Sequence, residues 1–153
     1  MALVSTGCYQ STFPLDAKPA TAVDPKLLGA WHCVSGSSDD AVIVTMARAR
    51  EGVYAATLTE KGEDPDHYEM HASRVGGQEF LNIRDMDTKS NKPWSYGRST
   101  LLRPDVLQLQ MVEEDAIKGA AETPAAVRAA IEKKLNDPAL FVKGPIVCVR
   151  ASR

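Results

Sequence analysis

The sequence is poor in the features that mark several large classes of protein. Aromatic residues make up only 6% of its 153 residues, which argues against a base-stacking surface for single-stranded nucleic acid. The 18 basic and 20 acidic residues almost balance, so we expect no strong field that attracts nucleic acid or an anionic membrane. No apolar run approaches the roughly 20 residues of a membrane-spanning helix. A chain of this length is expected to form one domain with its own core.

Cysteine is also scarce, with Cys8, Cys33 and Cys148 the only three in the chain. One intrachain pair would leave one thiol over, and no spacing is typical of a zinc site. A glycine-rich phosphate loop, a nucleophile elbow and a Ser/His/Asp constellation are all missing from the sequence. We therefore predict neither an enzyme nor a bound cofactor or metal.

Residues 1–23 are predicted to form a flexible tail. Residues 9–25 contain three prolines and many small residues, which favours an extended linker that contributes little to the core. Before it, the stretch Leu3-Val4-Ser5-Thr6-Gly7-Cys8 resembles the end of a bacterial lipoprotein signal. Ser5 stands where that family usually has leucine, and the basic start and apolar stretch of a full signal are missing.

The lipoprotein resemblance implies that Cys8 becomes a lipidated N-terminus. The protein would then sit on the periplasmic side of the bacterial envelope, with the lipid as its sole membrane attachment. The alternative is a disordered N-terminus that contains Gly-Cys by chance.

Residues 24–153 are predicted to form a mainly β domain. Asp24-Pro25 begins one helical turn, because Asp caps helices and proline suits the first helical position. Eight runs with strand character follow, separated by turn signals such as Gly76-Gly77 and Pro104-Asp105. These runs span residues 30–34, 42–50, 53–59, 67–75, 78–85, 94–103, 106–112 and 146–150. Consecutive hairpins give an antiparallel meander, and closing it into a barrel removes the exposed edges.

One helix is predicted just before the last strand. Thr123-Pro124 is a typical helix start, and Val127, Ile131 and Leu135 recur every four residues. Asn136-Asp137-Pro138 ends the helix. We expect its apolar face to cover the barrel.

The pattern resembles the lipocalin group and its relatives. Their shared mark is a helical turn that leads into Gly-x-Trp at the first strand, here Gly29-Ala30-Trp31. The resemblance implies that a late arginine packs over the tryptophan, and Arg150 is the candidate for this cation–π contact. Lipocalins carry their helix after the eighth strand, whereas this helix precedes it. The chain is therefore interpreted as a small bacterial envelope protein with a lipocalin-like barrel of about eight strands.

Closure of such a barrel makes the first and last strands neighbours. Cys33 and Cys148 lie on those strands, so we expect them to face each other and form a disulfide in an oxidising envelope. Two buried free thiols are the alternative.

Two sets of side chains are candidates for function. Trp94, Tyr96 and Arg98 alternate along one strand, and with Tyr54 and Phe80 they either line a ligand cavity or are ordinary barrel packing. His67, Glu69 and His71 also share one strand face, which would suit a metal. Because the opposite face of that strand is apolar, these three are predicted to face solvent.

Two functions compete at this point. The first is a non-enzymatic envelope lipoprotein that binds a small apolar ligand inside the barrel. The second is a membrane-tethered interaction or inhibitor module that binds an envelope protein and needs no cavity. A filled barrel argues against the first.

Overall fold

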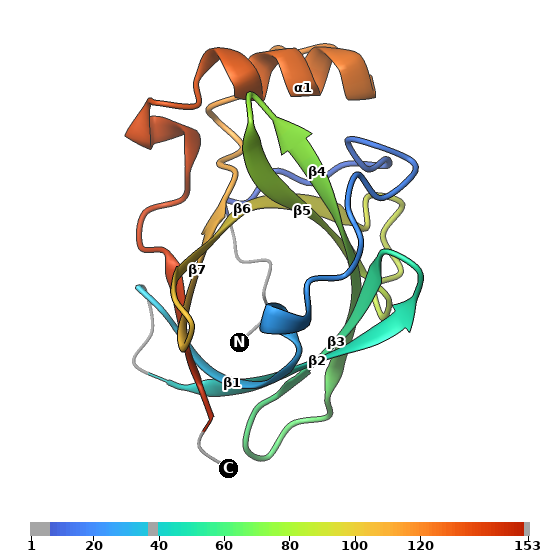
Figure 1. Ribbon diagram of the computed structural model, residues 1–153. Coiled ribbons are helices and arrows are strands. Elements are labelled where there is room, and N and C mark those ends of the chain that lie inside the picture. The colour runs from blue at the N-terminus through green and yellow to red at the C-terminus, as the bar shows by residue number, and fades with distance from the viewer. Residues whose placement is uncertain (1–6, 37–39, 152–153) are drawn as a thin grey trace.

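The computed structural model describes residues 7–36 and 40–151. Eight strands pair in chain order as an antiparallel meander, and β8 pairs with β1 to close a barrel (Figure 1). The strands are β1 (Gly29–Ser35), β2 (Val42–Arg50), β3 (Val53–Thr59), β4 (Asp66–Val75), β5 (Gln78–Asp85), β6 (Trp94–Arg103), β7 (Val106–Met111) and β8 (Ile146–Arg150). The predicted fold class and all eight predicted strands are confirmed, with boundaries that shift by one residue at most.

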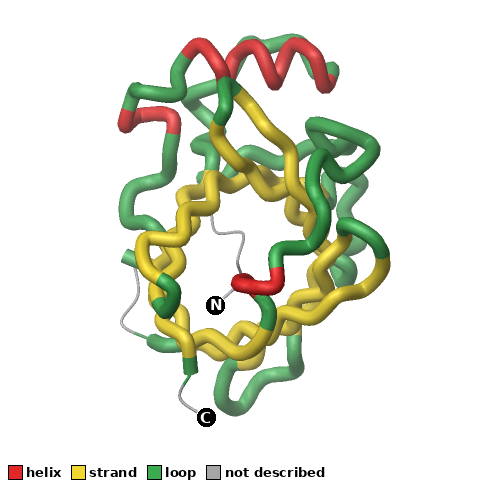
Figure 2. Tube along the Cα trace, in the orientation of Figure 1, coloured by secondary structure: helices red, strands yellow, loops and turns green. Residues whose placement is uncertain are grey.

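The predicted helical turn and helix are present, although the helix ends at Lys133, before Leu135, and a second 3-10 turn that the sequence did not predict follows it. The 3-10 turn η1 (Pro25–Leu27) precedes β1. Helix α1 (Pro124–Lys133) and the 3-10 turn η2 (Pro138–Leu140) lie between β7 and β8. The Asp24 and Thr123 side chains accept hydrogen bonds from backbone N–H groups in the first turns of η1 and α1. Figure 2 shows these short helical segments against the much larger strand content.

The buried residues form two separate clusters because the sheet buries apolar side chains on both faces. One cluster fills the barrel, where Tyr54, Met70 and Ile83 are register neighbours on the inward face. The other lies outside the barrel, between the outward face of β4–β6 and the segments that cover it. Val127 and Ile131 of α1 are fully buried in this outer cluster, so the helix covers the barrel as predicted.

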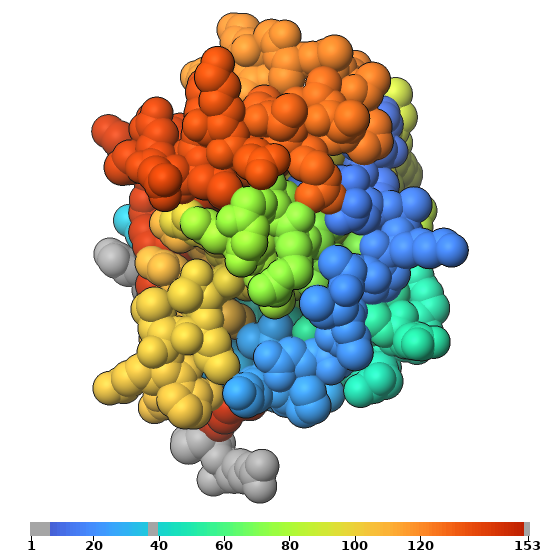
Figure 3. All heavy atoms as spheres, turned by 45° about the horizontal axis from the view of Figure 1, so that its top comes forward, coloured from blue at the N-terminus to red at the C-terminus, as the bar shows by residue number. Residues whose placement is uncertain are grey.

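Residues 7–23 differ from the predicted flexible tail. They run along the outer face of the sheet and complete the outer cluster, beside α1 and the β4–β5 hairpin (Figure 3). Leu15 is buried in this outer cluster and Val23 in the cluster that fills the barrel, and Ser11 exchanges two backbone hydrogen bonds with Trp94. The proline-rich composition favours an extended chain, but extended chain also pairs with a strand and packs on it. The tail prediction is therefore wrong for the described part of this segment.

One end of the barrel is closed by η1 and a buried tryptophan. The Trp31 ring is inaccessible to solvent, and its Nε1 donates a hydrogen bond to the Leu27 carbonyl over 3.0 Å. The Arg150 guanidinium lies 4.3 Å from the centre of that ring and donates a hydrogen bond to the Leu28 carbonyl. Gly29 adopts a φ of 110°, which lets the chain turn from η1 into β1 beside Arg150.

Candidate functional site

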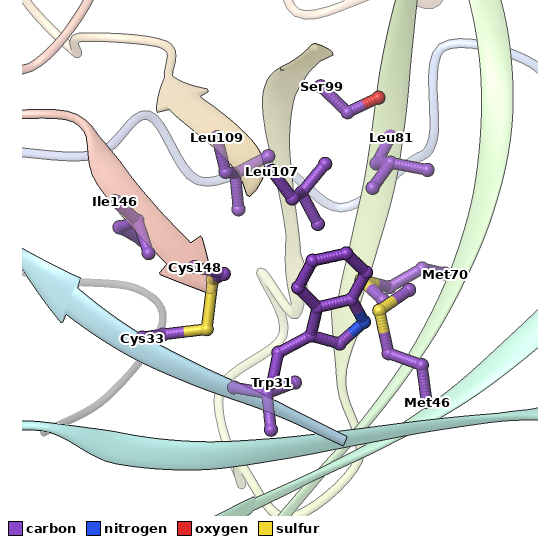
Figure 4. Close-up of a pocket in the computed structure, with 11 residues that line it drawn as sticks. Trp31, Cys33, Met46, Met70, Leu81, Ser99, Leu107, Leu109, Ile146 and Cys148 are labelled. Carbon is purple, nitrogen blue, oxygen red and sulfur yellow. A yellow bond between two sulfur atoms is a disulfide. The ribbon is translucent and has the colours of Figure 1, made fainter. Parts of the chain in front are cut away.

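The barrel interior is the first place where a ligand would bind, and the side chains that the structure describes almost fill it. A cavity of about 30 Å³ remains, lined by apolar side chains that include Trp31, Met46, Met70 and Leu107 (Figure 4). Ligand pockets in proteins usually occupy about 300–1,000 Å³, roughly ten times more. A space of this size holds one or two waters, and its apolar lining gives them few hydrogen-bond partners.

Gly97 shows how the filling is achieved. It occupies an inward position of β6, and a Cβ there would lie 2.7 Å from Leu109 Cδ1 and 3.0 Å from Met111 Sδ. The side chains of Leu109 and Met111 therefore use the space that a larger residue at position 97 would need. Small barrels commonly fill their interior in this way, by placing a small residue opposite large ones.

The five predicted ligand-binding residues do not come together at this cavity. Tyr54 belongs to the interior cluster, and its hydroxyl accepts a hydrogen bond from the Asp24 N–H that ties the chain before η1 to the barrel. Phe80 and Tyr96 belong to the outer cluster. Trp94 and Arg98 share the outward face of β6 with Tyr96. Four of the five thus lie outside the barrel, and the fifth does not border the cavity.

These outward side chains hold the covering segments in place. The Tyr96 hydroxyl donates to the Phe13 carbonyl over 2.7 Å, and burial raises the pKa of Tyr96 well above its usual range. Arg98 donates hydrogen bonds to Gln110, Gln78 and the Leu135 carbonyl. Burial lowers the pKa of Arg98 from its ordinary value. These contacts join β5, β6, β7 and the end of α1, which is a structural role.

Arg98 also packs against an aromatic ring. Its guanidinium lies 4.2 Å from the centre of the Phe141 ring, in the chain that follows η2. Trp94 also contacts a ring, since the His71 ring lies edge-on to it with 5.5 Å between the two ring centres.

A second cluster of polar side chains lies beneath the N-terminal segment. Asn82 is completely buried, accepts a hydrogen bond from the Leu15 N–H, and donates to the Ser73 hydroxyl and the His71 carbonyl. His71 Nε2 lies 2.7 Å from the Asp16 carbonyl oxygen. The prediction that His71 faces solvent is wrong, because residues 8–16 cover it.

This cluster contains the residue types of a hydrolase triad, but their arrangement differs from one. Burial would raise the pKa of Asp16, but hydrogen bonds from Ser73 and Arg128 outweigh it and hold that pKa below its usual range. Ser73 therefore pairs with the carboxylate, whereas His71 meets a backbone carbonyl. Ser73 is also inaccessible to solvent, so a substrate has no approach to its hydroxyl.

The other two members of the predicted histidine face have separate partners. Glu69 forms a two-point ion pair with Arg50, which lowers the pKa of Glu69. His67 lies 3.2 Å from Asp87. Within residues 7–36 and 40–151, no group of three or more His, Cys, Asp or Glu side chains is placed to hold a metal ion.

The predicted disulfide between Cys33 and Cys148 is present. The two cysteines are direct register partners across the β1–β8 seam, with 4.0 Å between their Cα atoms. The bond therefore locks the closure of the barrel. Cys8, the third cysteine, is buried, and its backbone forms an isolated antiparallel β-bridge with Glu113.

One surface was not found by sequence reasoning. The outward face of β8, β1 and β2 lies on the side of the barrel opposite α1, and β7 and β3 continue it on the two flanks (Figure 1). Val34, Ile43 and Val149 there are each at least 40% exposed. The signal in the sequence was the lack of charge at every second position of these strands, which becomes informative only once the inward face is known.

The chain matches no protein-family model, no curated protein and no solved structure at a significant level. Among the helices of the described residues, none is both long enough and apolar enough to span a membrane.

Proposed function

We propose that this protein is a non-enzymatic interaction module that binds another protein through its outer surface. The observation that carries this proposal is the dense packing of the barrel within residues 7–36 and 40–151, where the cavity beside Trp31, about 30 Å³, is too small for an apolar ligand of ordinary size. The two polar clusters described above, around Arg98 and around Asn82, hold the covering segments and are not arranged openly around a point where a substrate could react. A rigid barrel suits recognition, because little conformational freedom is lost on binding.

The proposed place of action is an oxidising compartment, the bacterial cell envelope. A disulfide between buried cysteines is typical of proteins outside the cytosol and supports this part of the proposal. Attachment through a lipid on Cys8 is the proposed anchor, and the barrel resembles the lipocalin type. Residues 8–23 bound to the barrel would then hold it close to the bilayer rather than on a long tether.

Native mass spectrometry of the unreduced protein from its own envelope extract tests the binding mode, with a denatured sample as control. We expect the polypeptide without a small-molecule adduct, alone or with another protein. An apolar adduct that is lost on denaturation would refute the proposal and favour the ligand carrier.

Radiolabelled palmitate tests the anchor separately. In the native host, the wild-type protein should incorporate the label and Cys8→Ala should not. A wild-type protein without label would remove the anchor from the proposal and leave the interaction function standing.

A further inference from the structure

The surface opposite α1 forms a continuous sheet face, which we call the open wall. Five cross-strand neighbours cross it in one row, from Thr59 on β3 through Ile43, His32 and Val149 to Val106 on β7. Val34, Val147 and Gln108 form a parallel row beside it. The remaining members lie on β1, β2 and β3: Ala30, Thr45, Ala47, Ala55 and Thr57.

No member of the open wall is an aspartate, glutamate, lysine or arginine. Asp, Glu, Lys and Arg make up 25% of the chain, yet every outward position in these rows is Val, Ile, Ala, Thr, Gln or His. Val34, Ile43 and Val149 are 40%, 41% and 48% exposed. An apolar patch with charged residues at its rim is the usual mark of a protein interface.

The strand pairing restricts how a partner can meet this surface. Because the barrel is closed, it offers no free strand edge to which another chain could add a strand. A partner must instead stack face to face, as two sheets do in a β-sandwich. The β-branched side chains of the open wall are those that pack well in such a layer.

The two ends of the open wall carry opposite charge. At one end, the β3–β4 connection and the start of β4 hold Glu60, Glu63, Asp64 and Asp66, against Lys61 alone. At the other end stand the four arginines Arg48, Arg50, Arg103 and Arg150. Three acids accompany them, because Glu69 pairs with Arg50, Asp105 pairs with Arg103 and Glu51 lies beside them, so a small positive excess remains. Two copies stacked with their strands antiparallel would therefore place the acidic end of each over the basic end of the other.

We propose that the open wall is the interface between two copies of this chain, related by a two-fold axis that lies in the interface and runs across the strands. In such an isologous contact each surface meets itself, so an uncharged centre avoids like-charge repulsion. The charged ends set the orientation and add little affinity. This interface goes beyond the proposed function and does not depend on the barrel being filled.

The area of the wall makes this a weak dimer. Strands about 4.8 Å apart and a rise of about 3.4 Å per residue give at most about 400 Å² per copy, an upper limit because the five strands curve around the closed barrel. This is about half of the standard 800 Å² per partner. We therefore expect a weak monomer–dimer equilibrium in which the dimer forms only at high protein concentration.

Sedimentation velocity of the full, unreduced chain from about 10 µM to about 1 mM tests the proposal across the range of weak association. The wild type should shift from monomer to dimer with concentration. Ile43→Asp should weaken the dimer at least about tenfold, because the substitution buries two charges per interface. Ala129→Asp is the control, since Ala129 is an exposed uncharged residue of α1, on the other side of the barrel from the wall.

Salt tests the orientation. Raising the ionic strength should weaken the antiparallel dimer, because it screens the attraction between opposite ends. The proposal is overturned by a wild type that stays monomeric at all concentrations, by a dimer that Ile43→Asp leaves intact, or by a dimer that salt strengthens. A ligand found by native mass spectrometry would refute the proposed function and leave this interface unaffected.

Discussion

Reduction of the Cys33–Cys148 disulfide is the perturbation whose size follows most directly from the structure. The bond joins cysteines 115 positions apart, across the seam where β1 meets β8. The loop-entropy relation for a loop of that size gives about 16 cal/mol/K, or about 4.8 kcal/mol at 25 °C. Because both thiols stay buried between paired strands, little native packing is lost, and the main effect is a freer unfolded chain.

The corresponding change in melting temperature is large enough to measure easily. An unfolding entropy of about 2.1 cal/mol/K per residue gives about 0.3 kcal/mol/K for this chain, so the loss corresponds to about 15 °C. Thermal unfolding followed by circular dichroism, with and without reductant, measures this difference. Reduction should proceed from the unfolded protein, since the cystine is shielded in the native state.

The double variant Cys33→Ala, Cys148→Ala serves as the control, because reductant should leave its melting temperature unchanged. A reduced wild type that melts within about 3 °C of the oxidised protein would refute the reasoning. It would mean that the β1–β8 seam closes the chain equally well without the covalent bond.

Three further predictions concern the outer face of β4–β6. Asn82→Leu should lower the unfolding free energy by about 2–4 kcal/mol, because it leaves several buried polar groups unpaired, and hydrogen exchange at the Leu15 amide should accelerate. Asp16→Asn should flatten the loss of stability in acid, measured by urea unfolding between about pH 2 and 5. The pKa of Asp16 is lowered in the folded state, so its contribution is present above its unfolded pKa and lost as pH falls through the folded value. Arg98→Lys should lower the unfolding free energy by about 1–2 kcal/mol, because lysine cannot reproduce the forked contacts to Gln110. An Asn82 variant as stable as wild type, an acid profile unchanged by Asp16→Asn, or a neutral Arg98→Lys would each contradict the role assigned to that residue.

The barrel was predictable because its signals are local. Gly76-Gly77 and Pro104-Asp105 are turns whose chemistry is read within a few residues, and consecutive hairpins leave few alternative topologies. Closure then placed Cys33 and Cys148 in register, which the disulfide confirms.

Which side chains of β5 and β6 point into the barrel could not be predicted, because both faces of these strands are buried. Phe80, Leu81, Asn82 and Ile83 are consecutive and all buried, so alternation no longer separates inside from outside. For this reason the sequence could not exclude Trp94, Tyr96 and Arg98 from the barrel.

The packing of residues 7–23 was also beyond local signals. Prolines and small residues favour extended chain, and the contacts that fix it come from distant positions, such as the Leu15 N–H to Asn82. The open wall was missed for a related reason. A lack of charge on alternate residues identifies a surface only when the inward face has been assigned.

Methionine methyl NMR tests the filled barrel, on which the account depends, most directly. Met46 and Met70 border the interior cavity, whereas Met86 is exposed on the surface and supplies the internal reference. With ¹³C-methyl labelling, a titration with fatty acids and small aromatic compounds should leave the Met46 and Met70 signals unshifted. Saturable shifts confined to those two signals would show a ligand inside the barrel and contradict the account.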